Sequence, residues 1–180
     1  MADKKMYVPV ILGTARKERA SEKVAQFVLA QAGLYGFETE LVDVRDYLYG
    51  ETIPPWVKDE RSTPWKNIAA RADGFIIVCP EYNHGYAGEL KILLDSAYTE
   101  YEKKPIGLCG VSSGVLRGAR GVENLRQVLI ALRSVAINNA VYFGNVAGLF
   151  EGDTLKDPEF YEKKAKGMFD QLASYIPSKG

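Results

Sequence analysis

Three polar stretches of this 180-residue chain follow directly on apolar runs, and each holds residue types that bind ligands. The most distinctive is Glu81-Tyr82-Asn83-His84-Gly85-Tyr86, which comes after the apolar run 74–79 and Pro80. The run is typical of a strand buried on both faces, and Pro80 has no N–H with which to continue a central ladder. The sequence therefore predicts this polar loop at the carboxyl end of a buried strand, where open α/β sheets bind ligands.

The second stretch begins at Gly13, which ends an apolar run over residues 7–12. A polar loop over residues 14–20 leads to Ser21, a residue type that commonly caps a helix. The unpaired N–H groups of a helix start, together with Arg16 and the loop hydroxyls, favour an anion such as a phosphate. A solvated loop before a capped helix explains the same residues, and this segment alone does not choose between the two interpretations.

The third stretch is a glycine-rich loop from Gly110 to Gly121, after a predicted strand over residues 105–109. Its start matches G-x-S-x-G, the pattern of a hydrolase nucleophile, with Ser112 as the serine. A catalytic triad would need a histidine after that serine, but the single histidine, His84, precedes it. We therefore prefer a loop whose backbone lies close to a flat ligand.

The elements around these loops predict a parallel, doubly wound α/β sheet. Strands alternate with helices along the chain, and such alternation gives parallel strands joined by helical crossovers. The predicted strands cover residues 7–12, 37–44, 74–79 and 105–109 and part of 136–143, and the predicted helices begin at Ser21, Lys66, Leu90, Val122 and Pro158. We expect one domain over residues 1–180, with a functional or interface loop over the proline-rich residues 45–65.

Composition narrows the classes of partner. Lysine and arginine balance aspartate and glutamate, which argues against nucleic acid and against an anionic membrane surface. Cys79 and Cys109 both lie in strand-like runs, so we expect reduced, buried thiols and a cytoplasmic protein. One histidine and no cysteine pair at ligand spacing argue against a metal site.

Three loops at one sheet edge suit a mononucleotide that carries a flat ring. Flavin mononucleotide (FMN) would place its phosphate on the first loop and its ring between the other two. Asp43, after the second strand, invites comparison with a dinucleotide-binding domain. The turn at Gly13 lacks the further glycines that such a domain needs near the pyrophosphate.

These motifs resemble those of the NADPH-dependent FMN reductase family of flavodoxin-like proteins, which includes quinone and azo-dye reductases. The family's phosphate loop stands here as Gly13-Thr14-Ala15-Arg16 with Ser21, its flavin-ring motif as residues 80–92, and its glycine loop as residues 110–118. The likeness runs from about residue 8 to about residue 149. It implies a five-stranded parallel sheet in the order 2-1-3-4-5, with helices on both faces.

The resemblance also implies which residues bind the cofactor. Thr14, Arg16 and Ser21 would hold the phosphate. Residues 80–83 would hold one edge of the ring, with Ser112 and Gly114 on its opposite side. The full implied set is Gly13, Thr14, Arg16, Arg19, Ser21, Pro80, Glu81, Tyr82, Asn83, His84, Ser112, Ser113, Gly114 and Arg117.

This sequence departs from the family pattern in each of the three loops. The first loop is longer between Arg16 and Ser21, so that Arg19 or Lys17 could share or replace a phosphate contact. In the ring motif, Ala87 replaces a proline and Ile92-Leu93 replaces Asn-Ala. In the third loop, Arg117 and Ala119 disturb a Gly-Gly pair. Ring contacts remain expected, while the substrate preference is left open.

The activity implied is a ping-pong oxidoreductase in which NADPH reduces the bound flavin and a quinone or azo compound then takes the electrons. No catalytic acid or base is needed, because the flavin carries the chemistry. The alternatives are a flavodoxin-type electron carrier or flavin-based redox sensor that docks to a protein, and a flavin-free binding module. The balanced charge favours the enzyme over a carrier, since carriers of this type are strongly acidic.

The resemblance further implies a homodimer or a dimer of dimers. The predicted helix 90–101 supports self-association, because Ile92, Tyr98 and Tyr101 widen its apolar surface beyond what one sheet face needs.

Overall fold

The computed structural model describes residues 5–177 and contains a parallel sheet of five strands in the order β2-β1-β3-β4-β5. This confirms the predicted fold class and strand order. The strands of this sheet are β1 (Val10–Leu12), β2 (Leu41–Asp43), β3 (Phe75–Pro80), β4 (Pro105–Val111) and β5 (Val135–Phe143).

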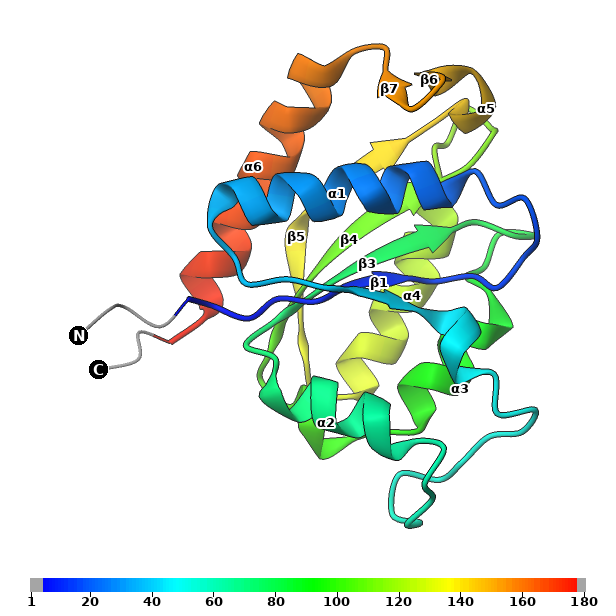
Figure 1. Cartoon of the computed structure of the whole chain (residues 1–180), viewed down its shortest axis with the longest axis vertical. Helices are drawn as coiled ribbons and strands as arrows, with labels where there is room; N and C mark the ends of the chain where they lie inside the picture. The colour runs from blue at the N-terminus through cyan, green and yellow to red at the C-terminus, as the bar shows by residue number, and fades with distance from the viewer. Residues whose placement is uncertain (1–4, 178–180) are drawn as a thin grey trace.

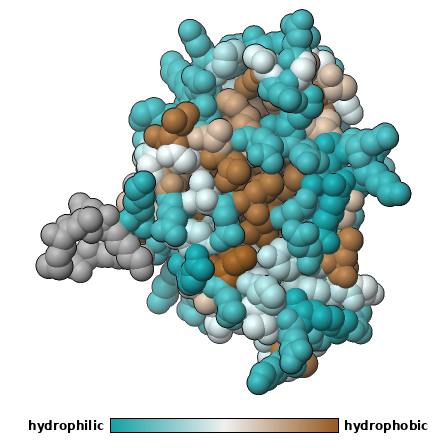
Figure 2. Space-filling view, in the orientation of Figure 1, coloured by the Kyte–Doolittle hydropathy of each residue, from teal (hydrophilic) through white to brown (hydrophobic). Residues whose placement is uncertain are grey.

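Helices cover both faces of the sheet (Figure 1). On one face lie α1 (Ser21–Tyr35) and α6 (Pro158–Tyr175). The other face carries α2 (Thr63–Arg71), α3 (Gly88–Asp95) and α4 (Ala119–Ala131). Every residue of β3 and β4 is buried, as expected for parallel strands between two layers of helices. In the view of Figure 1, apolar residues reach the surface mainly where the sheet edge lies between the two layers (Figure 2).

The strand register brings the ends of three strands to one edge. Leu12 at the end of β1 pairs with Val78 of β3, and Pro80 at the end of β3 pairs with Val111 at the end of β4. The loops that follow β1, β3 and β4 therefore leave the sheet side by side. Pro80 is the last residue of β3, one position beyond the predicted end of the strand.

The predicted loop over residues 45–65 was too long at its C-terminal end. The helix α2 begins at Thr63, with Pro64 in its first turn, and so includes Trp65. Trp65 is fully buried, and its Nε1 donates a hydrogen bond to the Tyr101 hydroxyl at 3.0 Å. The indole thus belongs to the core under α2.

The prediction of one helix over residues 90–101 was also wrong at its C-terminal end. The helix α3 stops at Asp95, and Ser96 Oγ donates to the Leu93 carbonyl at 2.7 Å. Such local side-chain bonds compete with continuation of a helix. The chain then makes the short 3₁₀ helix η2 (Thr99–Tyr101), in which Tyr101 is buried, so that its ring adds nothing to the outer surface.

Four short elements complete the fold. They are the 3₁₀ helix η1 (Val44–Tyr47), the helix α5 (Val146–Leu149) and the hairpin strands β6 (Phe150–Glu151) and β7 (Thr154–Leu155). The last helix begins at Pro158 as predicted, and the Asp157 carboxylate caps it by accepting a hydrogen bond from Phe160 N. None of the helices within residues 5–177 has the length and apolar character needed to span a bilayer.

Candidate functional site

The loop after β1 is held close to β3. Gly13 N donates to the Val78 carbonyl at 2.9 Å, and a Cβ at Gly13 would lie 2.8 Å from that same oxygen. Thr14 is fully buried, and its Oγ1 accepts a hydrogen bond from Arg16 N at 3.2 Å. The structure therefore ties the Thr14 side chain to the backbone of its own loop.

Ser21 is the first residue of α1, and the N-cap position belongs to Ala20. The prediction that Ser21 caps the helix was therefore wrong. Its side chain is buried, and Ser21 Oγ has no hydrogen-bond partner among the described residues. A buried hydroxyl without a partner is costly unless a ligand or water satisfies it, so this oxygen is free to bind a ligand at the end of the loop.

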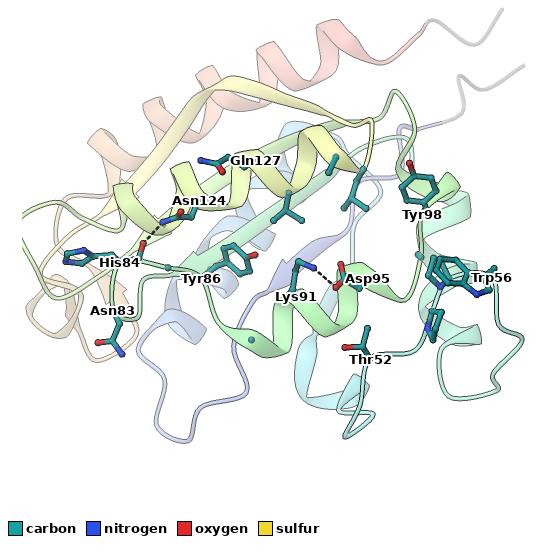
Figure 3. A pocket seen from close by; sticks show the side chains of 18 residues that line it. Thr52, Trp56, Asn83, His84, Tyr86, Lys91, Asp95, Tyr98, Asn124 and Gln127 are labelled. Atoms are coloured by element: carbon teal, nitrogen blue, oxygen red, sulfur yellow. Dashed lines mark hydrogen bonds and ion pairs between the residues drawn. The ribbon is translucent and has the colours of Figure 1, made fainter.

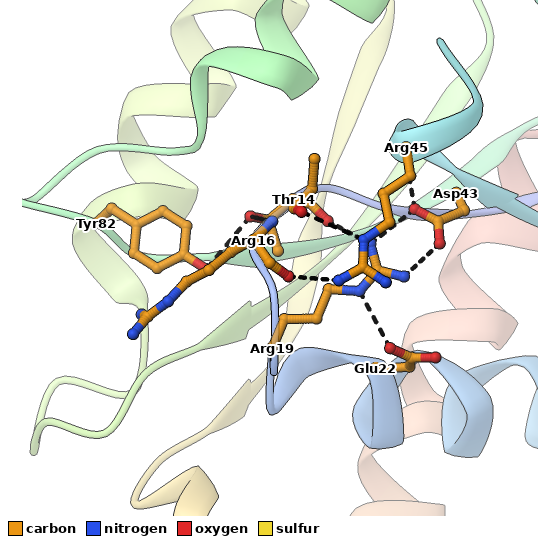
Figure 4. A network of polar contacts seen from close by, with 8 residues as sticks. Thr14, Arg16, Arg19, Glu22, Asp43, Arg45 and Tyr82 are labelled. Atoms are coloured by element: carbon orange, nitrogen blue, oxygen red, sulfur yellow. Dashed lines mark hydrogen bonds and ion pairs between the residues drawn. The ribbon is translucent and has the colours of Figure 1, made fainter. Parts of the chain in front are cut away.

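The two predicted arginines of this loop lie in different surroundings. Arg16 is exposed, and its guanidinium carbon lies 5.7 Å from the centre of the Tyr82 ring. Arg19 is only 6% exposed, and its guanidinium contacts Asp43, Glu22 and the Thr14 carbonyl (Figure 4). The structure thus leaves Arg16 available to an anion and commits Arg19 to partners within the protein.

The loop after β3 forms a tight two-residue turn. Tyr82 and Gly85 exchange backbone hydrogen bonds at 2.8 and 2.9 Å. Asn83 and His84 between them have φ values of 48° and 68°, and positive φ at both central residues is the requirement of a type I′ turn. The turn places Asn83 and His84 at the sheet edge, directly after β3.

Glu81 joins this turn to α4. Its carboxylate accepts hydrogen bonds from the backbone N–H groups of Arg120 at 3.1 Å and Gly121 at 3.3 Å, and it pairs with the Arg120 guanidinium. A carboxylate at a helix N-terminus satisfies free donors and interacts favourably with the helix dipole. Glu81 is therefore occupied as a cap, and only 9% of its side chain is exposed.

Two residues of α4 hold the turn from its other side. The Arg120 guanidinium contacts His84 Nε2, and Asn124 Nδ2 donates to the His84 carbonyl at 2.7 Å. These contacts occupy His84 with α4. The Ser112 hydroxyl accepts a hydrogen bond from Gly114 N at 2.8 Å, so serine and histidine have separate partners, which gives no support to a hydrolase triad.

The glycine loop after β4 is open at Gly114 and crowded at Gly118. A Cβ at Gly114 would meet only Ser112 Oγ, at 3.4 Å, and Ser113 beside it is exposed. Gly118 has φ of 89°, and a Cβ there would lie 2.4 Å from Val111 N. Gly118 is thus required by the fold, whereas Gly114 leaves space on the open side of the loop.

Arg117 stays within the glycine loop, where its backbone N–H donates a hydrogen bond to the Gly114 carbonyl at 3.1 Å. Its φ is 55°, and a Cβ at Gly144 would lie 2.3 Å from Arg117 Cγ. The Arg117 side chain therefore packs on the chain just beyond β5.

A groove of about 1090 Å³ runs along α3 and α4 from the turn after β3 (Figure 3). Asn83, His84 and Asn124 lie at one end, and Trp56 and Tyr98 lie at the other. The β3 turn closes one end of the groove, and the proline-rich loop before α2 closes the other end.

Several residues that shape this region were not predicted as site residues. Asp43 binds Arg19 of the first loop, and Arg45 donates hydrogen bonds to two carbonyl groups of that loop. Arg120 and Asn124 contact His84 in the β3 turn. Asp43, at the end of the second strand, could be identified from the sequence, but its partner Arg19 could not.

The arrangement fits FMN. A phosphate could take the exposed Arg16 guanidinium and the unpartnered Ser21 Oγ, since both come from the loop at the start of α1. A flat ring would find the β3 turn on one side and the open backbone at Gly114 on the other. The residues that would contact the phosphate and those that would contact the ring lie at the same sheet edge.

Comparison with known proteins gives a consistent result. A family model described as NADPH-dependent FMN reductase matches residues 6–148. The chain is 25% identical over 178 residues to an FMN-dependent NADPH-azoreductase of Staphylococcus haemolyticus, with 93% of each chain covered. It is 33% identical over 129 residues to an NAD(P)H-dependent FMN reductase of Schizosaccharomyces pombe, covering 66% of this chain and 63% of that protein.

Among solved structures, the chain resembles FerB, a flavoenzyme NAD(P)H:(acceptor) oxidoreductase from Paracoccus denitrificans. The TM-score is 0.78 at 20% identity, with 94% of this chain and 98% of that chain covered. This likeness shows the shared fold. Because the family model covers most of the sequence, the chain belongs to the NADPH-dependent FMN reductase family, whose cofactors are FMN and NADPH.

Proposed function

We propose that this protein transfers electrons from NADPH through bound FMN to a small oxidised acceptor, such as a quinone or an azo compound. The observation that carries the proposal is the contact between the first two loops, where Thr14 Oγ1 donates to the Tyr82 hydroxyl. This contact joins the loop at the start of α1 to the aromatic turn after β3. When bound, FMN would supply the two-electron chemistry that links NADPH to the second substrate, and the protein itself would supply binding and orientation.

In this proposal the first loop binds the phosphate of FMN, and the other two loops bind its ring. Arg16 and Ser21 hold the phosphate, and the turn at Asn83 and the backbone at Gly114 hold the ring. Backbone N–H groups beside the ring favour the negative charge that develops there, as fixed dipoles do in other active sites. No residue needs to act as a general acid or base.

Steady-state kinetics test the activity. We expect the purified protein to be yellow and to oxidise NADPH continuously when a quinone or an azo dye is supplied without any added reductase. The controls are the flavin-free protein and free FMN at the same concentration. A yellow protein that does not turn over NADPH would instead be a carrier or sensor, and a protein that binds no flavin would refute the proposal.

We further propose that the protein forms a homodimer through the groove along α3 and α4. Only two of its lining residues are charged, Lys91 and Asp95, and they pair with each other within one chain. Exposed aromatic side chains and few charges are typical of the centre of an interface. Trp56, which is 84% exposed, and Tyr98 supply such aromatic surface.

Sedimentation at micromolar concentration tests the dimer. We expect a dimer for the wild type and dissociation on Trp56→Ala. Tyr175→Ala is the matched control, because Tyr175 is an exposed aromatic residue of α6 on the other face of the sheet. A wild-type monomer would contradict the proposal. A cytoplasmic location is proposed as well, and it is supported by the two free, buried thiols of Cys79 and Cys109.

A further inference from the structure

Asp43, at the end of β2, organises two arginines beside the first loop. Its carboxylate binds the Arg19 guanidinium through two contacts, of which Nη1 to Oδ1 is 2.7 Å. Asp43 Oδ1 also accepts a hydrogen bond from Arg45 N at 3.0 Å, which sets the start of η1. The Asp43 carboxylate therefore positions the guanidinium group of Arg19 and the backbone N–H of Arg45.

Both arginines hold carbonyl groups of the first loop (Figure 4). Arg19 Nη1 donates to the Thr14 carbonyl at 2.5 Å. Arg45 Nε donates to the Ala15 carbonyl at 3.2 Å, and its Nη2 donates to the Arg16 carbonyl at 2.6 Å. Three successive carbonyls of the loop are thus drawn toward two guanidinium groups.

This arrangement decides where the N–H groups of the loop point. In a trans peptide the C=O and the following N–H lie on opposite sides of the chain. With the three carbonyls turned toward the arginines, the N–H groups of Ala15, Arg16 and Lys17 face the other way. The Arg16 N–H is bound by Thr14 Oγ1, and the N–H groups of Ala15 and Lys17 remain for an anion, as in other backbone anion sites.

We propose that Asp43, Arg19 and Arg45 form a carbonyl clamp that orients the loop for the FMN phosphate without touching the phosphate. Asp43 and the two arginines are therefore positioning residues. This inference rests on the proposed function, since it assumes that FMN binds here. It also changes the expected role of Arg19: the lengthened loop brings this arginine inward as a support and leaves Arg16 as the phosphate contact.

Arg19 is better suited to support the first loop than to bind the phosphate. Arg19 is 6% exposed, and four of its five N–H donors bind Asp43, Glu22 and the Thr14 carbonyl. Releasing it for a phosphate would leave the Asp43 carboxylate without its partner in a partly buried place, which is costly. If Arg19 instead supports the loop, its contacts with Asp43 and the Thr14 carbonyl stay in place when FMN binds.

Flavin titration of the apo-protein tests the clamp. Asp43→Asn should weaken FMN binding about tenfold, equivalent to about 1.4 kcal/mol, and should change riboflavin binding less than about twofold. Riboflavin lacks the phosphate, so the ratio of the two affinities reports on the loop and not on general stability. Glu22→Gln is the matched control, because it alters the exposed carboxylate that contacts the same arginine. It should leave both affinities unchanged.

Hydrogen exchange provides a second measurement that needs no flavin. The backbone amides of residues 14–20 should exchange faster in apo Asp43→Asn than in the wild type, while the amides of β3 and β4 should not change. If Asp43→Asn does not fold, Arg45→Gln replaces it. That substitution removes the guanidinium from the Ala15 and Arg16 carbonyls and leaves the pair between Arg19 and Asp43 in place.

The outcomes separate the clamp from the function on which it rests. A wild type that prefers FMN to riboflavin, with variants that keep the same preference, would overturn the clamp and leave the function standing. Equal losses for both flavins would overturn it too, because they indicate a merely structural role. If the wild type binds neither flavin, the proposed function fails, and unchanged exchange over residues 14–20 would then refute the clamp independently.

Discussion

Thr14 Oγ1 lies 3.3 Å from the Tyr82 hydroxyl, although 68 positions separate these residues in the chain. The Arg16 guanidinium lies over the same tyrosine ring. A cation placed over an aromatic face is attracted by the ring quadrupole. The first loop and the β3 turn therefore meet at the Tyr82 side chain, which contacts both Thr14 and Arg16.

Arg16→Ala should weaken FMN binding and leave riboflavin binding nearly unchanged. The substitution removes a charge-assisted contact to the phosphate, worth about 1.5–3 kcal/mol, which corresponds to roughly ten- to a hundredfold in affinity. Titration of the apo-protein with both flavins measures the effect. Lys17→Ala is the matched control from the same exposed loop. If Lys17→Ala loses FMN and Arg16→Ala does not, the phosphate contact belongs to Lys17.

Gly114→Val and Gly118→Ala should fail in different ways. At Gly114 the backbone is open, so the branched side chain should fold normally but occupy the ring site and prevent flavin binding. At Gly118, with φ of 89° and Val111 N close by, even a methyl group should destabilise the fold. Flavin content and thermal unfolding measure the two effects. A yellow, active Gly114→Val variant would show that the ring lies elsewhere.

Glu81→Ala should destabilise the protein by about 1–2 kcal/mol, because α4 loses the carboxylate that caps its first N–H groups. Urea denaturation measures the change in the free energy of unfolding. Glu162→Ala, at an exposed position within α6, serves as the control and should change it by less than about 0.5 kcal/mol. An unaffected Glu81→Ala variant would show that the link between the β3 turn and α4 contributes nothing to stability.

Both cysteines should be unreactive in the folded protein. Burial and the nearby Glu81 charge raise the pKa of Cys79 to about 12, and burial raises the pKa of Cys109 as well. Because the thiolate is the reactive form, Ellman's reagent at pH 8 should detect no thiol in the native protein and two after denaturation. Rapid reaction of either thiol before unfolding would contradict this prediction.

Stability should fall in acid partly through Asp43. Burial by itself would raise the pKa of this carboxyl, but the hydrogen bonds from Arg19 and from Arg45 N lower it below its usual value. A carboxyl with a lowered folded pKa stabilises the protein above its unfolded pKa of about 3.9, and that contribution is lost as the pH falls through the folded value.

Urea denaturation from pH 6 to pH 3 measures this dependence. The difference in unfolding free energy between the wild type and Asp43→Asn should stay constant above about pH 5 and shrink below about pH 4. Glu22→Gln serves as the control for a change of charge beside Arg19. A difference that stays constant down to pH 3 would show that Asp43 does not titrate as a partner of Arg19.

The amino-acid sequence by itself determined the parallel sheet and the three loops, whereas the strand order was implied by the family resemblance. Continuous apolar runs such as 75–79 can be satisfied only between two layers of helices, and their alternation with helical periodicity fixes a parallel sheet. The loops could be found because glycine, proline and hydroxyl residues mark strand ends locally. These signals need only neighbouring positions, so a single sequence contains them in full.

Only the tertiary structure decided what the charged and polar side chains of those loops do. On the sequence alone, Arg19 could share or replace a phosphate contact, and the register of β1 and β2 places Asp43 beside it as a partner. Glu81 is a cap because α4 begins against the β3 turn. The burial of Tyr101 depends likewise on another element, because Trp65 of α2 donates a hydrogen bond to its hydroxyl. A long side chain takes the partner that folding brings within reach, and that partner lies on another element whose distance along the sequence no local spacing encodes.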